Sequence, residues 1–334
     1  MPRNVVITGA SAGIGRAAAV AFARRGDRVA LLARGSDGLA GAERDVVRAG
    51  GTALAIPTDV ADVDQVEAAA ERVEREWGPI DVWVNNAMAT IFSPLLDIAP
   101  EDFRRATEVT YLGAVWGTRA ALKRMKPRDR GVIVQVGSAL SYRSIPLQSA
   151  YCGAKSGLRG FTDSLRAELI HDKSRVRLTA VLLSGFNTPQ FDWAKTTLNR
   201  QPQPVGTIYQ PEVAADAIVF AAAHDRRLIY VGLPALEAVI GNKFIAGFLD
   251  RLMARRAYEQ QFADQRLPPE RRDNLWQPVP GDHGAHGRFD AIARPYSWQL
   301  SATKHRGGVT LGLLGALSML AWLAGTRCRK GLRQ

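Results

Sequence analysis

The sequence predicts an α/β fold, a doubly wound parallel sheet of seven strands with helices on both faces. Three observations predict it. Short apolar runs alternate with longer segments of helical spacing over residues 1–232, an order typical of strand–helix–strand units. The runs are apolar on both faces, as the strands of a covered parallel sheet are. A glycine-rich turn joins the first run to the first helical segment.

The predicted strands are short apolar runs with helical segments between them. They read NVVIT, RVALLA, TALAIP, IDVWVN, GVIVQVG, VRLTAVLL and RLIYVG, at residues 4–8, 28–33, 52–57, 80–85, 131–137, 176–183 and 227–232. Residues 61–77 and 100–126 are two of the segments with helix-like spacing. With 334 residues, 46% of them hydrophobic, the chain can bury a large core, which argues against a disordered protein.

Charge and cysteine content narrow the class of protein. The formal net charge of +12 favours anionic partners such as lipid headgroups, nucleic acid or phosphorylated cofactors; arginines spread over a solvated surface are the alternative. The absence of a basic stretch interleaved with aromatics argues against a nucleic-acid partner. Two cysteines are too few for a disulfide framework and fit a reducing compartment. The N-terminus does not read as a signal peptide, so we expect the catalytic domain in the cytoplasm.

The turn after the first strand has the residues of a phosphate cradle. Gly9, Gly13 and Gly15 lie between a strand and a helix in TGASAGIG, together with Ser11 and Ile14. Glycines permit a tight turn and a close approach of the backbone to a pyrophosphate, whose charge the helix N-terminus attracts. A glycine turn also serves plain helix–strand packing. Its place in the first strand–helix–strand unit favours dinucleotide binding.

The tip of the second strand indicates which dinucleotide binds. An acidic residue there would bind the ribose 2′-hydroxyl of NAD, but the tip offers Ala33 and Arg34, and an arginine can hold the 2′-phosphate of NADP. Arg16 could assist it. We therefore expect NADP(H), with NAD(H) as the less favoured cofactor; a solvated loop arginine is the alternative for Arg34. Asp59, next to Val60, could accept from the adenine amino group or only begin a helix.

One stretch, GSALSYRSIPLQSAYCGAK, carries the chemistry. Tyr151 and Lys155 are four residues apart and share a helix face. A nearby ammonium favours the tyrosinate, so we expect the pKa of Tyr151 to be lowered toward neutrality. Ser138 ends the preceding strand and can donate to a carbonyl oxygen. The three side chains predict proton transfer to an oxygen while a hydride reaches its carbon.

These motifs, in this order, resemble the short-chain dehydrogenase/reductase family, in the branch with a single Rossmann domain. TGASAGIG, NNA, YCGAK and the Ser138–Tyr151 spacing carry the resemblance, which covers about residues 4–232. It implies an NAD(P)(H)-dependent oxidoreductase in which Ser138 orients the substrate, Tyr151 is the acid/base and Lys155 also binds the nicotinamide ribose. It further implies that Asn86 braces the cofactor edge of the sheet and that Thr188 contacts the cofactor.

The chain departs from the family pattern at several positions. Met88 replaces the glycine of Asn-Asn-Ala-Gly, and Ser184–Gly185 replaces Pro-Gly after the sixth strand. Thr110 stands where many members place an asparagine that anchors a water chain through the catalytic lysine, so we expect a rearranged proton relay. The usual apolar ending with a Gly-Gly pair is missing after Val231. The remaining residues are therefore an addition to the core.

Two further features have simple explanations. His283 and His286 lie with Asp282 and Asp290 in DHGAHGRFD, where metal binding is conceivable, but a glycine-rich loop lacks the rigid frame of a metal site and a plain polar loop is favoured. Cys152 follows the proposed acid/base on another face of the helix, so we expect it to pack in the core.

The segment after residue 232 divides into three parts. Residues 233–306 combine an apolar helical stretch with a Pro-, Gly- and charge-rich extension that reads as a linker or a surface wrap. Residues 307–325 carry no charge and would span roughly 29 Å as a helix, so they predict a transmembrane helix, with a basic tail over 326–334. A buried core helix is one alternative. A re-entrant or interfacial segment is another, because the basic tail opposes the positive-inside tendency.

The sequence therefore predicts an NADP(H)-dependent oxidoreductase that interconverts a carbonyl and a secondary alcohol. Association with the membrane through the C-terminal helix suggests a lipophilic small-molecule substrate, with membrane lipid as a second partner. A homo-oligomer is left open. The alternative is a non-catalytic membrane-bound NADP(H)-binding scaffold or redox sensor, prompted by Thr110 and the long extension.

Overall fold

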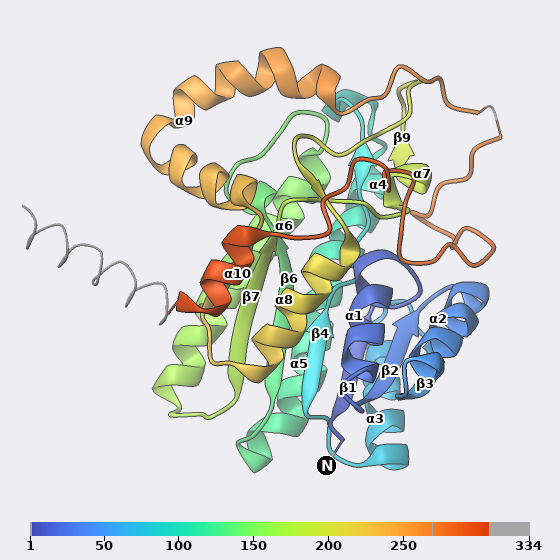
Figure 1. The fold of residues 1–334 in the computed structure, drawn as a ribbon, viewed down its shortest axis with the longest axis vertical. Coiled ribbons are helices and arrows are strands. Elements are labelled where there is room, and N and C mark those ends of the chain that lie inside the picture. Colours follow the sequence, from blue (N-terminus) through green and yellow to red (C-terminus); the bar gives the residue numbers. More distant parts are fainter. Residues whose placement is uncertain (1, 269, 307–334) are drawn as a thin grey trace, which may run out of the picture.

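Seven parallel strands form one sheet at the centre of the molecule (Figure 1). The computed structural model describes residues 2–268 and 270–306. The order across the sheet is β11-β7-β6-β4-β1-β2-β3. The chain thus builds one half outward from β1, crosses back, and builds the other half from β4. The predicted doubly wound topology is confirmed with all its strands: β1 (Asn4–Thr8), β2 (Arg28–Ala33), β3 (Thr52–Pro57), β4 (Val82–Asn85), β6 (Val132–Ser138), β7 (Arg177–Leu183) and β11 (Leu228–Val231).

Helices cover both faces of this sheet (Figure 1). Successive strand residues point to opposite faces: Val5 and Ile7 pack in one core cluster and Val6 in the other, all fully buried. This explains why the strands read as continuous apolar runs. The first cluster is covered by α1 (Gly13–Ala23), α2 (Ser36–Arg48) and α8 (Pro211–Ala223). The second is covered by α3 (Val63–Trp77), α4 (Pro100–Thr107), α5 (Gly113–Met125) and α6 (Ser149–His171).

Short strand pairs build a wall beyond the sheet. β5 (Ile91–Phe92) pairs with β9 (Lys195–Thr196), and β8 (Gly185–Phe186) pairs with β10 (Ile208–Tyr209). The helical turn α7 (Gln190–Trp193) lies between them in sequence. A third apolar cluster, which includes Phe92, Phe191 and Phe289, joins these pieces to the C-terminal part of the chain. This wall therefore depends on residues from distant parts of the sequence, from Phe92 to Phe289.

The addition after β11 folds back over the core. Helix α9 (Leu233–Gln260) has a kink at Ile245, where φ is −133° and ψ is 36°. From α9 the chain crosses to the side of α1 and α2 and returns to α10 (Trp298–Lys304) (Figure 1). Leu300 of α10 is buried in the first core cluster. The addition is thus anchored to the sheet at its beginning and at its end.

The predicted transmembrane helix needs correction. Within residues 2–268 and 270–306, every helix is too short or too polar to cross a bilayer. Even α9, with 28 residues, carries charges such as Lys243, Asp250 and Arg251, which are costly in hydrocarbon. The span placed over 307–325 and the tail over 326–334 lie outside the described residues. A fold that includes a membrane-spanning helix, and a location set by one, is thus wrong for the part of the chain that the structure describes.

Candidate active site

The predicted phosphate cradle lies in the turn from β1 to α1. Gly9 and Gly13 have φ values of +66° and +57°, in the left-handed region that favours glycine. A Cβ on Gly15 would lie 2.5 Å from Asn86 Nδ2 and closer still to the carbonyl oxygen of Gly9. Asn86 Nδ2 donates to the carbonyl oxygens of Thr8, at 2.9 Å, and Gly9, at 3.2 Å. The turn is therefore as tight as the glycine spacing predicts, and Asn86 fastens it to the sheet.

The cradle opens into one cavity of about 720 Å³ that continues past the predicted catalytic residues. Every predicted site residue except Gly15 and Arg16 lines this cavity, and Gly15 supports the turn from behind. The lining residues are Gly9, Ser11, Gly13, Ile14, Arg34, Asp59, Val60, Asn86, Ser138, Tyr151, Lys155 and Thr188. The structure thus brings together side chains from β1, β2, β4, β6 and α6 at the carboxyl edge of the sheet, where such folds bind ligands.

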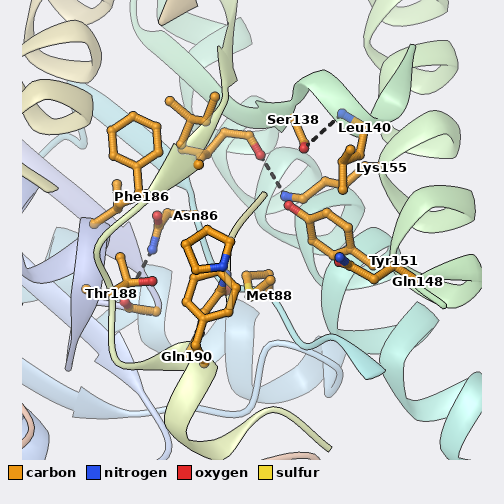
Figure 2. Close-up of a pocket in the computed structure, with 18 of the residues that line it drawn as sticks. Asn86, Met88, Ser138, Leu140, Gln148, Tyr151, Lys155, Phe186, Thr188 and Gln190 are labelled. Atoms are coloured by element: carbon orange, nitrogen blue, oxygen red, sulfur yellow. Dashed lines mark hydrogen bonds between the residues drawn. The ribbon is translucent and has the colours of Figure 1, made fainter. Parts of the chain in front are cut away.

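Ser138, Tyr151 and Lys155 lie together on one side of this cavity (Figure 2). Ser138 ends β6, and its Oγ accepts a hydrogen bond of 3.1 Å from the backbone N–H of Leu140. Tyr151 and Lys155 are one helical turn apart on α6, and Lys155 Nζ lies 5.7 Å from the centroid of the Tyr151 ring. Nζ also donates to the carbonyl oxygen of Val136 at 2.7 Å. The three side chains therefore face the same space, and those of Ser138 and Lys155 have backbone partners.

Burial sets the protonation of this group. It raises the pKa of Tyr151 to about 12 and lowers the pKa of Lys155 to about 8, because each charged form loses its hydration. The expected lowering of the tyrosine pKa is therefore wrong for the chain alone: the loss of hydration outweighs the hydrogen bond with Ser138, which lowers the pKa. The phenol of Tyr151 stays protonated at neutral pH, so it is a proton donor as it stands.

Thr110 lies within η2 (Glu108–Leu112), a π-helical turn that links α4 to α5. Its side chain is fully buried, with Oγ1 donating to the carbonyl oxygen of Ala89 at 2.8 Å and accepting from the backbone N–H of Ala89 at 2.9 Å. Both functions of the hydroxyl are thus used by one backbone unit. Thr110 fixes the segment after β4, and its hydroxyl has no hydrogen to spare for a relay through Lys155.

A segment that the sequence did not place covers the opposite end of the cavity. Residues 274–284, here called the strap, line it with side chains and backbone of Asn274, Pro278, Val279, Gly281 and His283. Arg34 donates to the carbonyl oxygens of Leu275, at 3.2 Å, and Trp276, at 3.0 Å. The Pro- and Gly-rich composition predicted a surface wrap, but composition carries no signal for the surface on which it lies.

The other charged groups at this end are already paired. Asp59, predicted to bind adenine, forms an ion pair with Arg105. Arg16, predicted to assist Arg34, is buried beneath the turn between Asp45 and Asp282. Arg16 therefore ties the cradle to α2 and the strap and does not line the cavity. Arg34 forms no ion pair with any described carboxylate, and Asp59, which interacts with it over a longer distance, is already paired with Arg105.

The two histidines of the extension have separate surroundings. His286 lies 2.8 Å from both Glu212 and Asp290, and the His283 ring packs edge-on against Trp193 at 4.8 Å between centroids. Within residues 2–268 and 270–306, no group of three or more suitable side chains could hold a metal ion. Cys152 is buried in the core, and burial raises the pKa of its thiol.

Comparisons with known proteins agree with this geometry. A sequence model described as short chain dehydrogenase matches residues 3–198. The uncharacterised oxidoreductase YxnA of Bacillus subtilis is 34% identical over 97% of this chain and 91% of its own length. The cis-4-hydroxycyclohexanecarboxylate dehydrogenase of Sinomonas cyclohexanicum is 36% identical over 72% of this chain and 96% of its own length. The L-rhamnose 1-dehydrogenase (NAD(P)(+)) of Azotobacter vinelandii is 33% identical over 68% of this chain and 92% of its own length.

Two solved structures share the fold with bound cofactor. An alcohol dehydrogenase from the archaeon Thermococcus sibiricus, complexed with 5-hydroxy-NADP, superposes with a TM-score of 0.60 at 26% identity, covering 69% of this chain and 95% of its own. A metagenomic short-chain oxidoreductase in complex with NADP gives 0.57 at 29% identity, covering 68% and 95%. The chain belongs to the short-chain dehydrogenase family and is an oxidoreductase that acts on CH–OH groups with NAD(P).

Proposed function

We propose that the protein is an NADP(H)-dependent reductase of lipophilic ketones, or a dehydrogenase of the matching secondary alcohols, with Tyr151 as the proton-transfer residue. One observation carries the proposal: Ser138, Tyr151 and Lys155 line the same cavity as the glycine cradle. A proton donor, an oxygen-binding hydroxyl and a dinucleotide site thus share one space. That is the minimum needed to reduce a carbonyl group.

The residues of the cradle end fit a dinucleotide. Gly9 and Gly13, both with positive φ, line the cavity without side chains, so the backbone is accessible to a pyrophosphate, and the tight packing behind Gly15 keeps the turn in this shape. The cradle, Thr188 and Lys155 would hold the cofactor, and Arg34 would hold its 2′-phosphate. When bound, the reduced cofactor supplies a hydride for the carbonyl carbon.

The chain's own residues then handle the oxygen. Because Ser138 Oγ accepts from Leu140 N–H, its own proton remains available to donate to the carbonyl oxygen. Tyr151 gives its phenolic proton to that oxygen as the carbon gains the hydride, which yields the alcohol and a tyrosinate. The ammonium of Lys155, 5.7 Å from the ring centroid, stabilises the tyrosinate until solvent returns the proton. Alcohol oxidation follows the same steps in reverse.

Arg34 supports NADP(H) over NAD(H). It lines the cavity at the tip of β2, and Ala33 stands beside it where an acidic side chain would serve NAD. It forms no ion pair with a described carboxylate, and Asp59 nearby is paired with Arg105, so a 2′-phosphate would give Arg34 a direct anionic partner. The NADP complexes of the two similar structures are consistent with this preference.

The far side of the cavity supports a lipophilic substrate. Beyond Ser138 and Tyr151 its wall includes apolar side chains of β5, β8, α7, α9 and the loops near them: Phe92, Leu140, Ile145, Phe186, Phe191, Val205, Ile245, Leu249 and Met253. Arg143 also lines it, but its guanidinium binds Asn242 at 3.1 Å and Asp250 at 2.6 Å on α9. A bulky apolar ketone therefore gains more from this wall than a small polar one.

Purified protein, NADPH and a panel of ketones of increasing apolar size test the proposal. We expect NADPH oxidation, followed by absorbance, to rise with apolar size. In Tyr151→Phe, turnover should fall by about 10³-fold, because the proton donor is lost, while NADPH affinity stays within about twofold. Cofactor binding without turnover of any ketone or alcohol would favour the non-catalytic scaffold. Equal activity in Tyr151→Phe would contradict the mechanism.

A further inference from the structure

The strap closes the cofactor cavity at its Arg34 end. Pro278 would lie 3.2 Å from a Cβ on Gly35, so the strap and the start of α2 are in van der Waals contact. The backbone N–H of Gly281 donates to Asp37 at 2.9 Å, and the carbonyl oxygen of Gly284 accepts from the backbone N–H of Gly13 at 3.0 Å. The strap is therefore fastened both to α2 and to the cradle itself.

The strap also determines where the guanidinium of Arg34 lies. Its Nη1 donates to the carbonyl oxygens of Leu275 and Trp276, at 3.2 and 3.0 Å, and its Nη2 donates to that of Asn274. Three consecutive backbone carbonyls thus hold one arginine by neutral acceptors. These carbonyls orient the guanidinium of Arg34 without neutralising its charge, so the charge remains available to an anion in the cavity.

Two side chains anchor the strap to the core. Leu275 is fully buried and belongs to the second core cluster. Trp276 Nε1 donates to Asp102 of α4 at 2.7 Å, and the guanidinium of Arg105 lies 5.6 Å from the Trp276 ring. Arg105 Nε also donates to the carbonyl oxygen of Leu275 at 3.2 Å. The strap can leave the cavity only if these contacts to α4 and the core are broken.

We propose that the strap is a cofactor-binding element that fixes Arg34 against the 2′-phosphate of NADP(H) and must move before the cofactor can leave. The inference rests on the proposed function, in which this cavity holds NADP(H). Leu275 and Trp276 are then positioning residues, since they act through Arg34. The strap retains either dinucleotide, but its effect through Arg34 applies only to the one that carries the 2′-phosphate.

Stopped-flow fluorescence of bound NADPH, chased with excess NADP⁺, measures the release rate. In Leu275→Ala we expect release about tenfold faster and a similar loss in the preference for NADPH over NADH, because the strap loses its buried anchor. The matched control is Leu300→Ala, the same truncation of a buried leucine in α10, which packs in the first core cluster and does not line the cavity. Its release rate and cofactor preference should equal those of the wild type.

Trp276→Phe provides a second variant in case Leu275→Ala does not fold. It keeps an aromatic ring under Arg105 but removes the hydrogen bond to Asp102, so we expect release roughly fivefold faster. Faster release with unchanged preference would overturn the positioning of Arg34, and unchanged release in both variants would overturn the strap proposal. If the wild type binds no NADPH, the proposed function fails instead.

Discussion

Two parts of the cofactor cavity, the cradle and the strap, are built in opposite ways. The cradle is local: Gly9, Gly13 and Gly15 lie within one turn between a strand and the helix that follows it. The strap is remote: Arg34 reaches carbonyl oxygens that lie 240 to 242 positions later in the chain. One end is therefore determined by backbone geometry and the other by long-range contacts, although a single ligand would touch both.

This difference separates what each end contributes. The cradle must exist before any dinucleotide can bind, because it presents the backbone to the pyrophosphate. The strap adds no unpaired charge to the cavity, because its Asp282 forms ion pairs with Arg16 and Arg44. It adds orientation and enclosure. Substitutions in the cradle should thus abolish dinucleotide binding, whereas substitutions in the strap or at Arg34 should alter the preference for NADPH over NADH.

The largest effect is expected from Gly15→Ala, which breaks the cradle. The new methyl group would lie 2.5 Å from Asn86 Nδ2 and nearer still to the Gly9 carbonyl oxygen, so the turn must shift. We expect NADPH affinity to fall by more than about 100-fold, measured by fluorescence titration, and the free energy of unfolding by about 1–3 kcal/mol. Gly160→Ala on α6, where a Cβ would meet open space, is the control. Unaltered NADPH binding in Gly15→Ala would show that the cradle is not the pyrophosphate site.

A smaller effect is expected from Arg34→Asp, at the residue that the strap holds in the cavity. Reversing this charge repels a 2′-phosphate and suits a ribose hydroxyl, so the NADPH-to-NADH ratio of kcat/KM should fall by roughly 10- to 100-fold. The control is Arg25→Asp, the same charge change on an exposed residue beyond the far end of α1. A ratio equal to that of the control would refute the phosphate-binding role of Arg34.

The smallest effect is a pH dependence of activity that comes from Lys155 at the catalytic site and not from the strap. Burial lowers the pKa of Lys155 to about 8, so its charge is present below that pH and is lost above it. We expect kcat/KM for NADPH, which reports the free enzyme, to fall by up to about tenfold between pH 7 and pH 9. The same midpoint should appear in Leu275→Ala, because the strap does not contact Lys155. In Lys155→Arg, which stays charged, a fall with the same midpoint would contradict the assignment.

The sequence predicted the core well because its signals are local. Each strand of the seven-stranded sheet is a short apolar run that a helical segment precedes or follows in the sequence. The cavity residues were also predictable, since Ser138, Tyr151 and Lys155 need only a strand end and one helical turn to meet. Their electrostatics were not. The pKa of Tyr151 rises because of burial, which depends on how loops from distant parts of the chain cover the site.

The C-terminal part was the least predictable. Leu275 and Trp276 are a short apolar pair in a polar, proline-rich stretch, and no periodic pattern around them shows that Leu275 enters the core. The partners of Asp282 and Trp276 are Arg16 and Asp102, which lie 266 and 174 positions away in the sequence. Thr110 was likewise recognisable in the sequence as a departure from the family pattern, but its two hydrogen bonds to the backbone of Ala89 could be found only in the folded structure. Such pairings have no periodicity to reveal them.

Amide hydrogen exchange, followed by mass spectrometry with and without NADPH, tests most directly whether the cradle and the strap enclose one ligand. The cradle and the strap line the same cavity, and the backbone N–H of Gly13 donates to the carbonyl oxygen of Gly284 where they meet. We predict that NADPH slows exchange in peptides covering residues 9–15 and, to a similar degree, in peptides covering 274–284, while α5 (Gly113–Met125) is unchanged. Slower exchange in the cradle peptides alone, with the strap unaffected, would contradict the account.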